Sequence, residues 1–240
     1  MSLAWLLGAV VIFAAHFVFG LAGFGVGLVA MAFLPFIMSP ATAVVLMTVY
    51  AMIFAIVLFV PLRRDCTPRA VVGLVVGSLL GTPAGVWILA VASASVLNRL
   101  IGLMLVIVVA LEFANRLPRR LPGRGWGLGA GVLAGLIGGA VGLPGPPTVI
   151  YATTQGWSPR TFKANLQAFF IVNQSVTVAS YWVAGLLTAE VLRLTASYFV
   201  PATIGIVVGM AFFDRVDAAR FRRIVFVLLF AAGVLLLVGG

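Results

Sequence analysis

A glycine-rich stretch appears twice in this chain, each time inside a long apolar run. Residues 20–28 read GLAGFGVGL and residues 135–143 read GLIGGAVGL, so six of nine positions match without a gap. Because glycine is a poor helix former, several glycines close together predict a break or turn in a helix. Matched breaks in two halves indicate a transporter's substrate site, because broken backbone persists in a bilayer only beside protein or a watery cavity. Close packing of helices through small residues is the alternative.

Composition places both breaks in a membrane. Hydrophobic residues make up 63% of the 240 residues, charged residues make up 8%, and mean hydropathy is +1.25. These values predict a polytopic membrane protein. The net charge of +10 would suggest nucleic-acid binding in a soluble protein, but the basic residues lie in short gaps between apolar runs, so we expect no nucleic-acid partner. A single cysteine, Cys66, excludes an intrachain disulfide and disfavours a cysteine-based metal cluster.

The apolar runs divide one integral membrane domain into two repeats, residues 1–118 and 119–240. Each repeat starts with a glycine-rich break, and SPAT at 39–42 in the first matches SPRT at 158–161 in the second. A full span needs about 20 apolar residues. The runs expected to cross are 41–62, 70–92 and 96–115, then 163–186, 191–213 and 224–239. In the second of these, glycines spaced four residues apart predict a smooth face for tight helix contact: Gly73, Gly77, Gly81 and Gly85.

The distribution of Lys and Arg separates two topologies. If each glycine-rich region crosses the membrane once, the two sides hold eight and seven of the 15 basic residues, which gives no bias. If each region is a re-entrant hairpin, one side holds thirteen and the other holds only Arg99 and Arg193. The positive-inside rule favours the second arrangement. We therefore predict an all-α, multi-pass protein of the cytoplasmic membrane with two inverted repeats and both termini outside.

The two breaks supply the first candidates for ligand contact. Half-helix N-termini present free N–H groups and positive dipole ends, which suit an anion, and glycine lets a ligand approach the backbone. Prolines 144, 146 and 147 remove donors from the second break, so the two breaks cannot contribute equally. The candidate residues are Gly23, Gly25 and Gly27 at the first break, and Gly138, Gly139, Gly142, Pro144 and nearby Tyr151 at the second.

The span 163–186 is unusually polar. Gln167, Gln174 and Thr177 fall along one stripe at helical spacing, which continues to Tyr181, and Asn173 lies beside it. Because amides are costly toward lipid, the stripe should face protein or a cavity, where substrate contact and helix–helix hydrogen bonding are both open. The only histidine, His16, is a candidate for proton coupling, with a neutral, hydrogen-bonded packing role as the alternative.

At the motifs GLAGFGVGL (20–28) and GLIGGAVGLPGPP (135–147), the chain resembles the TauE/SafE sulfite-exporter family of membrane permeases, also called TSUP. The resemblance extends over the size, the two halves and the basic central loop. Ala140 and Val141 interrupt a glycine run that is commonly longer in the family. The resemblance implies transport of sulfite, sulfonates or related organosulfur anions.

These observations predict a transporter for a small anion, either sulfite, a sulfonate or another organosulfur anion. We expect the anion to bind between the two glycine-rich broken helices near the bilayer midplane. The alternatives are a permease for another small solute, such as an amino or carboxylic acid, a membrane scaffold, or an intramembrane enzyme. No HExxH, GxSxG or Walker motif supports an enzyme, and no cofactor or metal is expected. The expected partners are the small anion and the lipid bilayer, and a homo-oligomer stays open.

Overall fold

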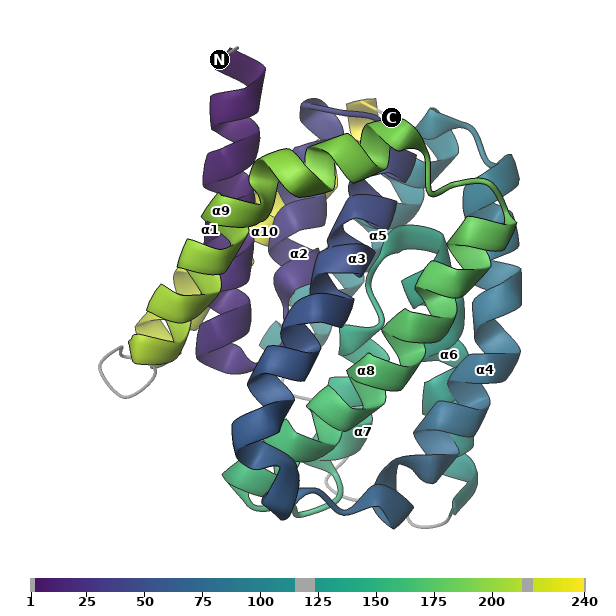
Figure 1. Ribbon diagram of the computed structural model, residues 1–240, viewed down its shortest axis with the longest axis vertical. Helices are drawn as coiled ribbons and strands as arrows, with labels where there is room; N and C mark the ends of the chain where they lie inside the picture. Colours follow the sequence, from purple (N-terminus) through teal and green to yellow (C-terminus); the bar gives the residue numbers. More distant parts are fainter. Residues whose placement is uncertain (1–2, 115–123, 213–217, 240) are drawn as a thin grey trace. The chain divides into compact units, whose positions relative to one another are not determined.

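The computed structural model describes residues 3–114, 124–212 and 218–239, and the secondary structure in these ranges is entirely helical (Figure 1). Helices long and apolar enough to cross a membrane number five within these ranges, in agreement with an integral membrane protein. They are Leu3–Ala22, Pro40–Asp65, Pro68–Val91, Ala94–Leu111 and Ala189–Ala211. Arg116, Arg119, Arg120 and Arg215 lie outside the described residues, as do both chain ends and the side chains of residues 112–124 and 213–225.

The order of helices repeats. The first half holds α1 (Leu3–Ala22), α2 (Val26–Phe33) with the 3₁₀ turn η1 (Leu34–Phe36), α3 (Pro40–Phe59) with η2 (Val60–Asp65), α4 (Pro68–Val91) and α5 (Ala94–Ala114). The second half holds α6 (Arg124–Val141), α7 (Gly145–Thr153), α8 (Pro159–Val183), α9 (Ala189–Ala211) and α10 (Ala218–Gly239). Each half is thus a long helix, a short helix and three long helices. The inverted orientation of the halves stays a prediction.

Both breaks are built by the same left-handed glycine. Gly23 ends α1 with a φ of 79°, and its N–H donates to the Phe19 carbonyl at 2.7 Å. Gly142 ends α6 with a φ of 71°, and its N–H donates to the Gly138 carbonyl at 2.9 Å. Glycine is favoured in this helix-ending motif because a side chain is strained at positive φ.

The helix-ending glycines show which residues of the two halves correspond, and this correspondence differs from the one given by the motif match. Gly23 and Gly142 are 119 positions apart, as are Ser39 and Ser158, whose hydroxyls accept N–H bonds at the starts of α3 and α8. The matched motifs instead pair residues 115 positions apart, which would set Gly27 beside Gly142. Gly27 lies in the first turn of α2, so the match is displaced by about one helical turn.

Each break reverses the chain and forms a hairpin. Gly138 packs against the Pro144 ring at the break, and the Tyr151 hydroxyl of α7 reaches Gly127 near the start of α6, so α7 runs back along α6. Gly25 faces Val18 at the first break, and α2 packs along α1 (Figure 1). At each break, the glycines therefore let the chain reverse, so that a short helix packs along the long helix before it.

The helices form two compact units that each draw on both halves. The first unit is Met1–Met47, Ala92–Arg116 and Ala189–Gly240, and the second is Thr48–Val91 and Leu117–Thr188. In the first unit α1 packs on α9, and in the second α6 packs on α4. The opening helix of each half thus pairs with the fourth helix of the other. The division into two repeats, 1–118 and 119–240, stays a prediction, because the compact units are defined by packing and each contains parts of both halves.

In the second unit, glycine brings α4 and α6 into backbone contact. A methyl group added at Gly77 or Gly81 of α4 would overlap the carbonyl oxygen of Leu128 or Val132, and one at Gly135 of α6 would overlap that of Ser78. The predicted contact face of α4 is therefore confirmed for the glycines from 77 to 85. In the first unit, Gly209 of α9 meets the Phe17 backbone of α1 in the same way.

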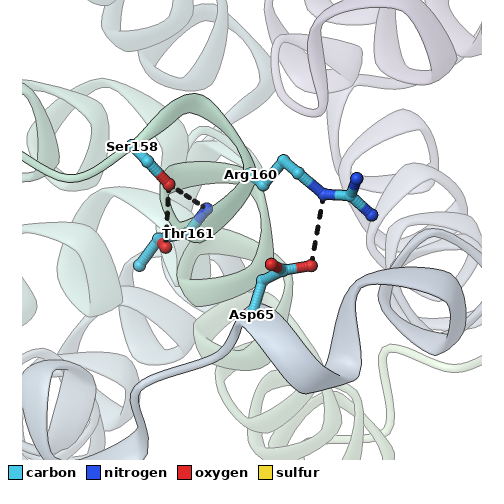
Figure 2. Close-up of polar contacts among 4 residues, drawn as sticks. All are labelled: Asp65, Ser158, Arg160 and Thr161. Carbon is cyan, nitrogen blue, oxygen red and sulfur yellow. Dashed lines mark hydrogen bonds and ion pairs between the residues drawn. The ribbon is translucent and has the colours of Figure 1, made fainter.

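The described basic residues of the second unit gather at one end. Arg160 of α8 pairs with Asp65 of η2, with Nε and Oδ2 3.3 Å apart (Figure 2). The Thr67 N–H donates to Asn165 Oδ1 at 2.8 Å, so α8 begins where α4 begins. The side chains concerned are Arg63, Arg64, Arg69, Arg160 and Lys163. Such a concentration is the charge pattern of a cytoplasmic membrane surface.

Two glycines on the same helix provide a matched test of this packing. A methyl group at Gly73 meets its nearest atoms at 3.5 Å, an ordinary contact, whereas one at Gly77 overlaps the α6 backbone. We expect Gly77→Ala to lower stability by roughly 1–3 kcal/mol through overpacking. Gly73→Ala should be neutral or slightly stabilising, because alanine is the better helix former. Thermal unfolding in detergent measures both, and equal midpoints would contradict the contact.

Cysteine labelling tests whether α8 crosses the membrane with its basic end inside. Native Cys66, beside η2, should react only from the cytoplasmic side. Ala184→Cys, just after α8 on a Cys66→Ser background, should react only from outside. Burial raises the pKa of the Cys66 thiol, so less thiolate forms at neutral pH and labelling should accelerate as pH rises. Labelling of both positions from one side would exclude a crossing α8.

Candidate functional site

Buried polar side chains concentrate in the second unit. Among the described residues, the buried polar set of that unit contains only amides and hydroxyls, and no Lys, Arg, Asp or Glu. His16 is the one member found in the first unit. Helix α8 supplies half of the second-unit set, in agreement with a stripe turned away from lipid. The set is Thr48, Ser78, Thr82, Thr148, Thr154, Asn165, Gln167, Asn173, Gln174 and Thr177.

Tyr181 ties the polar helix to the second break. Its hydroxyl donates to the Gly139 carbonyl at 2.8 Å and lies 3.4 Å from the Gly138 carbonyl. Thr48 of α3 also hydrogen-bonds the Tyr181 side chain. The last carbonyls of a helix have no partner within the helix, so this hydroxyl satisfies groups that the break of α6 exposes. Sequence reasoning placed Tyr181 on the stripe but not in the site, and its spacing four residues after Thr177 was the available signal.

The polar stripe runs from this break toward the basic end. Because α8 begins beside α4 and ends at the break of α6, the three helices run in the same direction. Thr177 and Asn173 precede Tyr181 by four and eight residues, so they lie about 6 and 12 Å from it along the axis. Asn173 and Gln174 therefore lie near the middle of α8, between the break and the basic end.

Asn173 stands out because both polar atoms of its side chain lack a hydrogen-bond partner. The residue is 0% exposed, and neither Nδ2 nor Oδ1 is paired. Gln174 Oε1, on the same helix, and Thr82 Oγ1, on α4, are likewise buried and unpaired. Buried polar groups are nearly always paired in proteins, and leaving one unpaired costs about 1–3 kcal/mol. By contrast, the Thr177 hydroxyl donates to the Asn173 carbonyl at 2.8 Å.

The glycines of the second break serve mainly to bring helices together. A methyl group at Gly138 would lie 2.9 Å from Pro144 Cβ, and one at Gly139 would lie 2.9 Å from the Thr82 carbonyl oxygen. Pro144 is the N-cap of α7, and its carbonyl accepts the Thr148 hydroxyl. Tyr151 is buried and packs edge-on to Trp157. The second break is thus a close-packed hairpin, which Tyr181 connects to α8.

The remaining predicted site residues lie in the first unit. Gly25 is the N-cap of α2 with a φ of 91°, Gly27 lies in the first turn, and Gly23 ends α1. The first turn of α2 holds no proline and therefore keeps the N–H groups that prolines 146 and 147 remove from α7. His16 is buried, and its Nδ1 lies 2.7 Å from the Ile12 carbonyl oxygen one turn earlier. Proton coupling by His16 stays a prediction.

Comparison with known protein families identifies the family of this chain. The family model described as Sulfite exporter TauE/SafE matches residues 7–236, nearly the whole chain. The chain belongs to the TauE/SafE family. No curated protein and no solved structure matches it. The family and the five long apolar helices make this TauE/SafE protein a multi-pass membrane protein of a transporter family, not of an enzyme family.

At the basic end of this TauE/SafE protein, the stability contributed by a buried polar contact can be compared with that of an exposed one. Asn165 is 0% exposed and holds the Thr67 N–H, whereas the Arg160 side chain of the Asp65 pair is 73% exposed. Asn165→Leu should lower stability by about 1–3 kcal/mol, because it leaves the Thr67 N–H without its acceptor. Asp65→Asn should cost less than about 1 kcal/mol, as exposed ion pairs do. Thermal unfolding at low and high salt measures both, and a larger loss for Asp65→Asn would reverse the assignment.

Proposed function

We propose that this protein transports a small sulfur oxyanion, either sulfite or a sulfonate, across the cytoplasmic membrane. Family membership supports transport and the sulfur-anion class. The observation that carries the site is Asn173, a fully buried amide with both polar atoms unpaired. Its neighbours on α8 and the break between α6 and α7 complete the proposed contact surface. The proposed contacts in the second unit are Gln167, Asn173, Gln174 and Thr177, with Gly138, Gly139, Gly142, Pro144 and Tyr151 around the second break. Contacts at Gly23, Gly25 and Gly27 of the first break stay a separate prediction from the sequence.

A neutral polar surface suits a transporter better than a buried cation would. Amide N–H and hydroxyl groups donate to oxyanion oxygens, and each such bond contributes modestly. A buried Lys or Arg would bind an anion strongly and slow its release. Conduction requires binding that is favourable enough for entry and weak enough for exit. The buried polar set of the second unit supports the proposal, because among the described residues it holds amides and hydroxyls and no charged side chain.

Ligand-dependent stabilisation of the purified protein tests the proposal. A ligand that binds only the folded state at a hundred times its Kd adds about 2.7 kcal/mol of stability. Sulfite or ethanesulfonate should therefore raise the melting midpoint in detergent, and either should accumulate in proteoliposomes. Acetate and glycine serve as the carboxylate and amino-acid comparisons. Stabilisation by acetate or glycine, with none by sulfur anions, would favour the permease for another solute.

Substitution of the α8 amides locates the site. Asn173→Leu and Gln174→Leu should abolish stabilisation by sulfite and its transport. Both variants should still fold, because replacing an unpaired buried polar group by an apolar one removes a desolvation cost. Asn98→Leu is the matched control, since Asn98 Oδ1 is also buried and unpaired but lies on α5 of the first unit. Wild-type transport by Asn173→Leu, or equal loss in Asn98→Leu, would remove α8 from the site.

A further inference from the structure

The charge and hydrogen-bonding pattern around Asn173 also selects the form of the anion. We infer that this site takes a singly charged oxyanion or a zwitterion that carries its own hydrogen-bond donor, and that it excludes doubly charged oxyanions. For sulfite, the transported form is then the protonated monoanion, not the dianion. This inference rests on the proposed function and specifies its substrate.

The absence of a buried cation among the described residues limits the charge that the site can hold. The buried polar set of the second unit is uncharged, so nothing in it neutralises an entering anion. The five described basic side chains of that unit lie at one end, away from the middle of α8. Moving one charge from water into a low-dielectric interior is costly, and the Born cost grows with the square of the charge. A dianion therefore incurs about four times the monoanion's penalty for the same neutral partners.

The unpaired atoms of Asn173 call for a donor on the ligand. Nδ2 donates and Oδ1 only accepts, and both are buried without partners. This holds whichever way the amide is oriented, because both positions are unpaired. A fully deprotonated oxyanion offers only acceptors. It can accept a hydrogen bond from Nδ2, but it leaves Oδ1 without a donor and places its own lone pairs against those of Oδ1. A ligand with an O–H or an ammonium group satisfies both atoms of the amide.

Two sulfonates that differ by one hydroxyl group test the donor requirement on the wild-type protein. Ethanesulfonate and 2-hydroxyethanesulfonate are both monoanions of similar size, and only the second can donate. We expect 2-hydroxyethanesulfonate to bind about tenfold more tightly, which is the range of one satisfied buried hydrogen bond. Asn98→Leu should preserve this preference, whereas Asn173→Leu should bind neither sulfonate measurably. Equal or tighter binding of ethanesulfonate to the wild type would overturn the donor requirement.

A pH series with sulfite tests the charge requirement. Sulfite loses its last proton near neutral pH, so the monoanion fraction falls as pH rises. The apparent Kd for total sulfite should rise by about tenfold per pH unit in the alkaline range, because only the competent fraction binds. The affinity for 2-hydroxyethanesulfonate, which stays a monoanion, should hold constant and so controls for titration of the protein. Sulfite affinity that is unchanged or increases with pH would overturn the inference and leave sulfite transport standing.

Sulfate completes the comparison. It is a dianion throughout the same pH range and has no donor, so it should neither stabilise the protein nor compete with sulfite. Competition by sulfate at concentrations similar to sulfite would overturn the exclusion of dianions. If no sulfur anion binds at any pH, the proposed function itself fails, which is a different result from binding without selectivity for charge or donor.

Discussion

Inside a bilayer every backbone N–H and C=O must find a partner within the protein, and the architecture of both hairpins follows from this requirement. A helix that ends at membrane depth exposes its last carbonyls. At the break of α6, the left-handed Gly142 returns its N–H to the Gly138 carbonyl, and Tyr181 donates to the Gly139 carbonyl. At the break of α1, Gly23 closes on Phe19 in the same way. Each reversal therefore keeps a hydrogen bond on at least one of the carbonyls that end the helix.

Close approach of helices is the second consequence of the glycine content. Where glycines of α4 and α6 face one another, the backbones touch directly, and the dispersion contacts of two helix surfaces replace those of side chains. This arrangement gives the second unit a tightly joined pair of helices beside α8. Glycines in similar sequence surroundings therefore differ in whether they contact a neighbouring helix. Gly77 is packed against backbone, whereas Gly129 meets nothing within 4 Å.

The polar stripe of α8 contrasts with these well-satisfied elements. The Thr177 hydroxyl donates to the helix backbone and the Tyr181 hydroxyl donates to α6, so both donors have partners within the protein. The Asn173 side chain differs from these two, because its amide is buried and unpaired. Buried polar groups that a fold leaves unsatisfied are expected at functional positions, where a ligand supplies the missing bonds. A site of neutral amides also fits a transporter, which must release what it binds.

Local chemistry was enough to predict much of this protein. Apolar runs and scarce charge determine that it is helical and spans a membrane, clustered glycines determine where helices break, and helical spacing determines that α8 has one polar face. Only the tertiary structure decided which partner each residue has. It showed that Gly138 and Gly139 pack against Pro144 and α4, that the true register of the caps differs from the motif match, and that Asn173 is unpaired while Tyr181 is bonded. Periodicity depends on neighbours within a few residues, whereas these contacts join segments distant in the chain, so no local pattern specifies them.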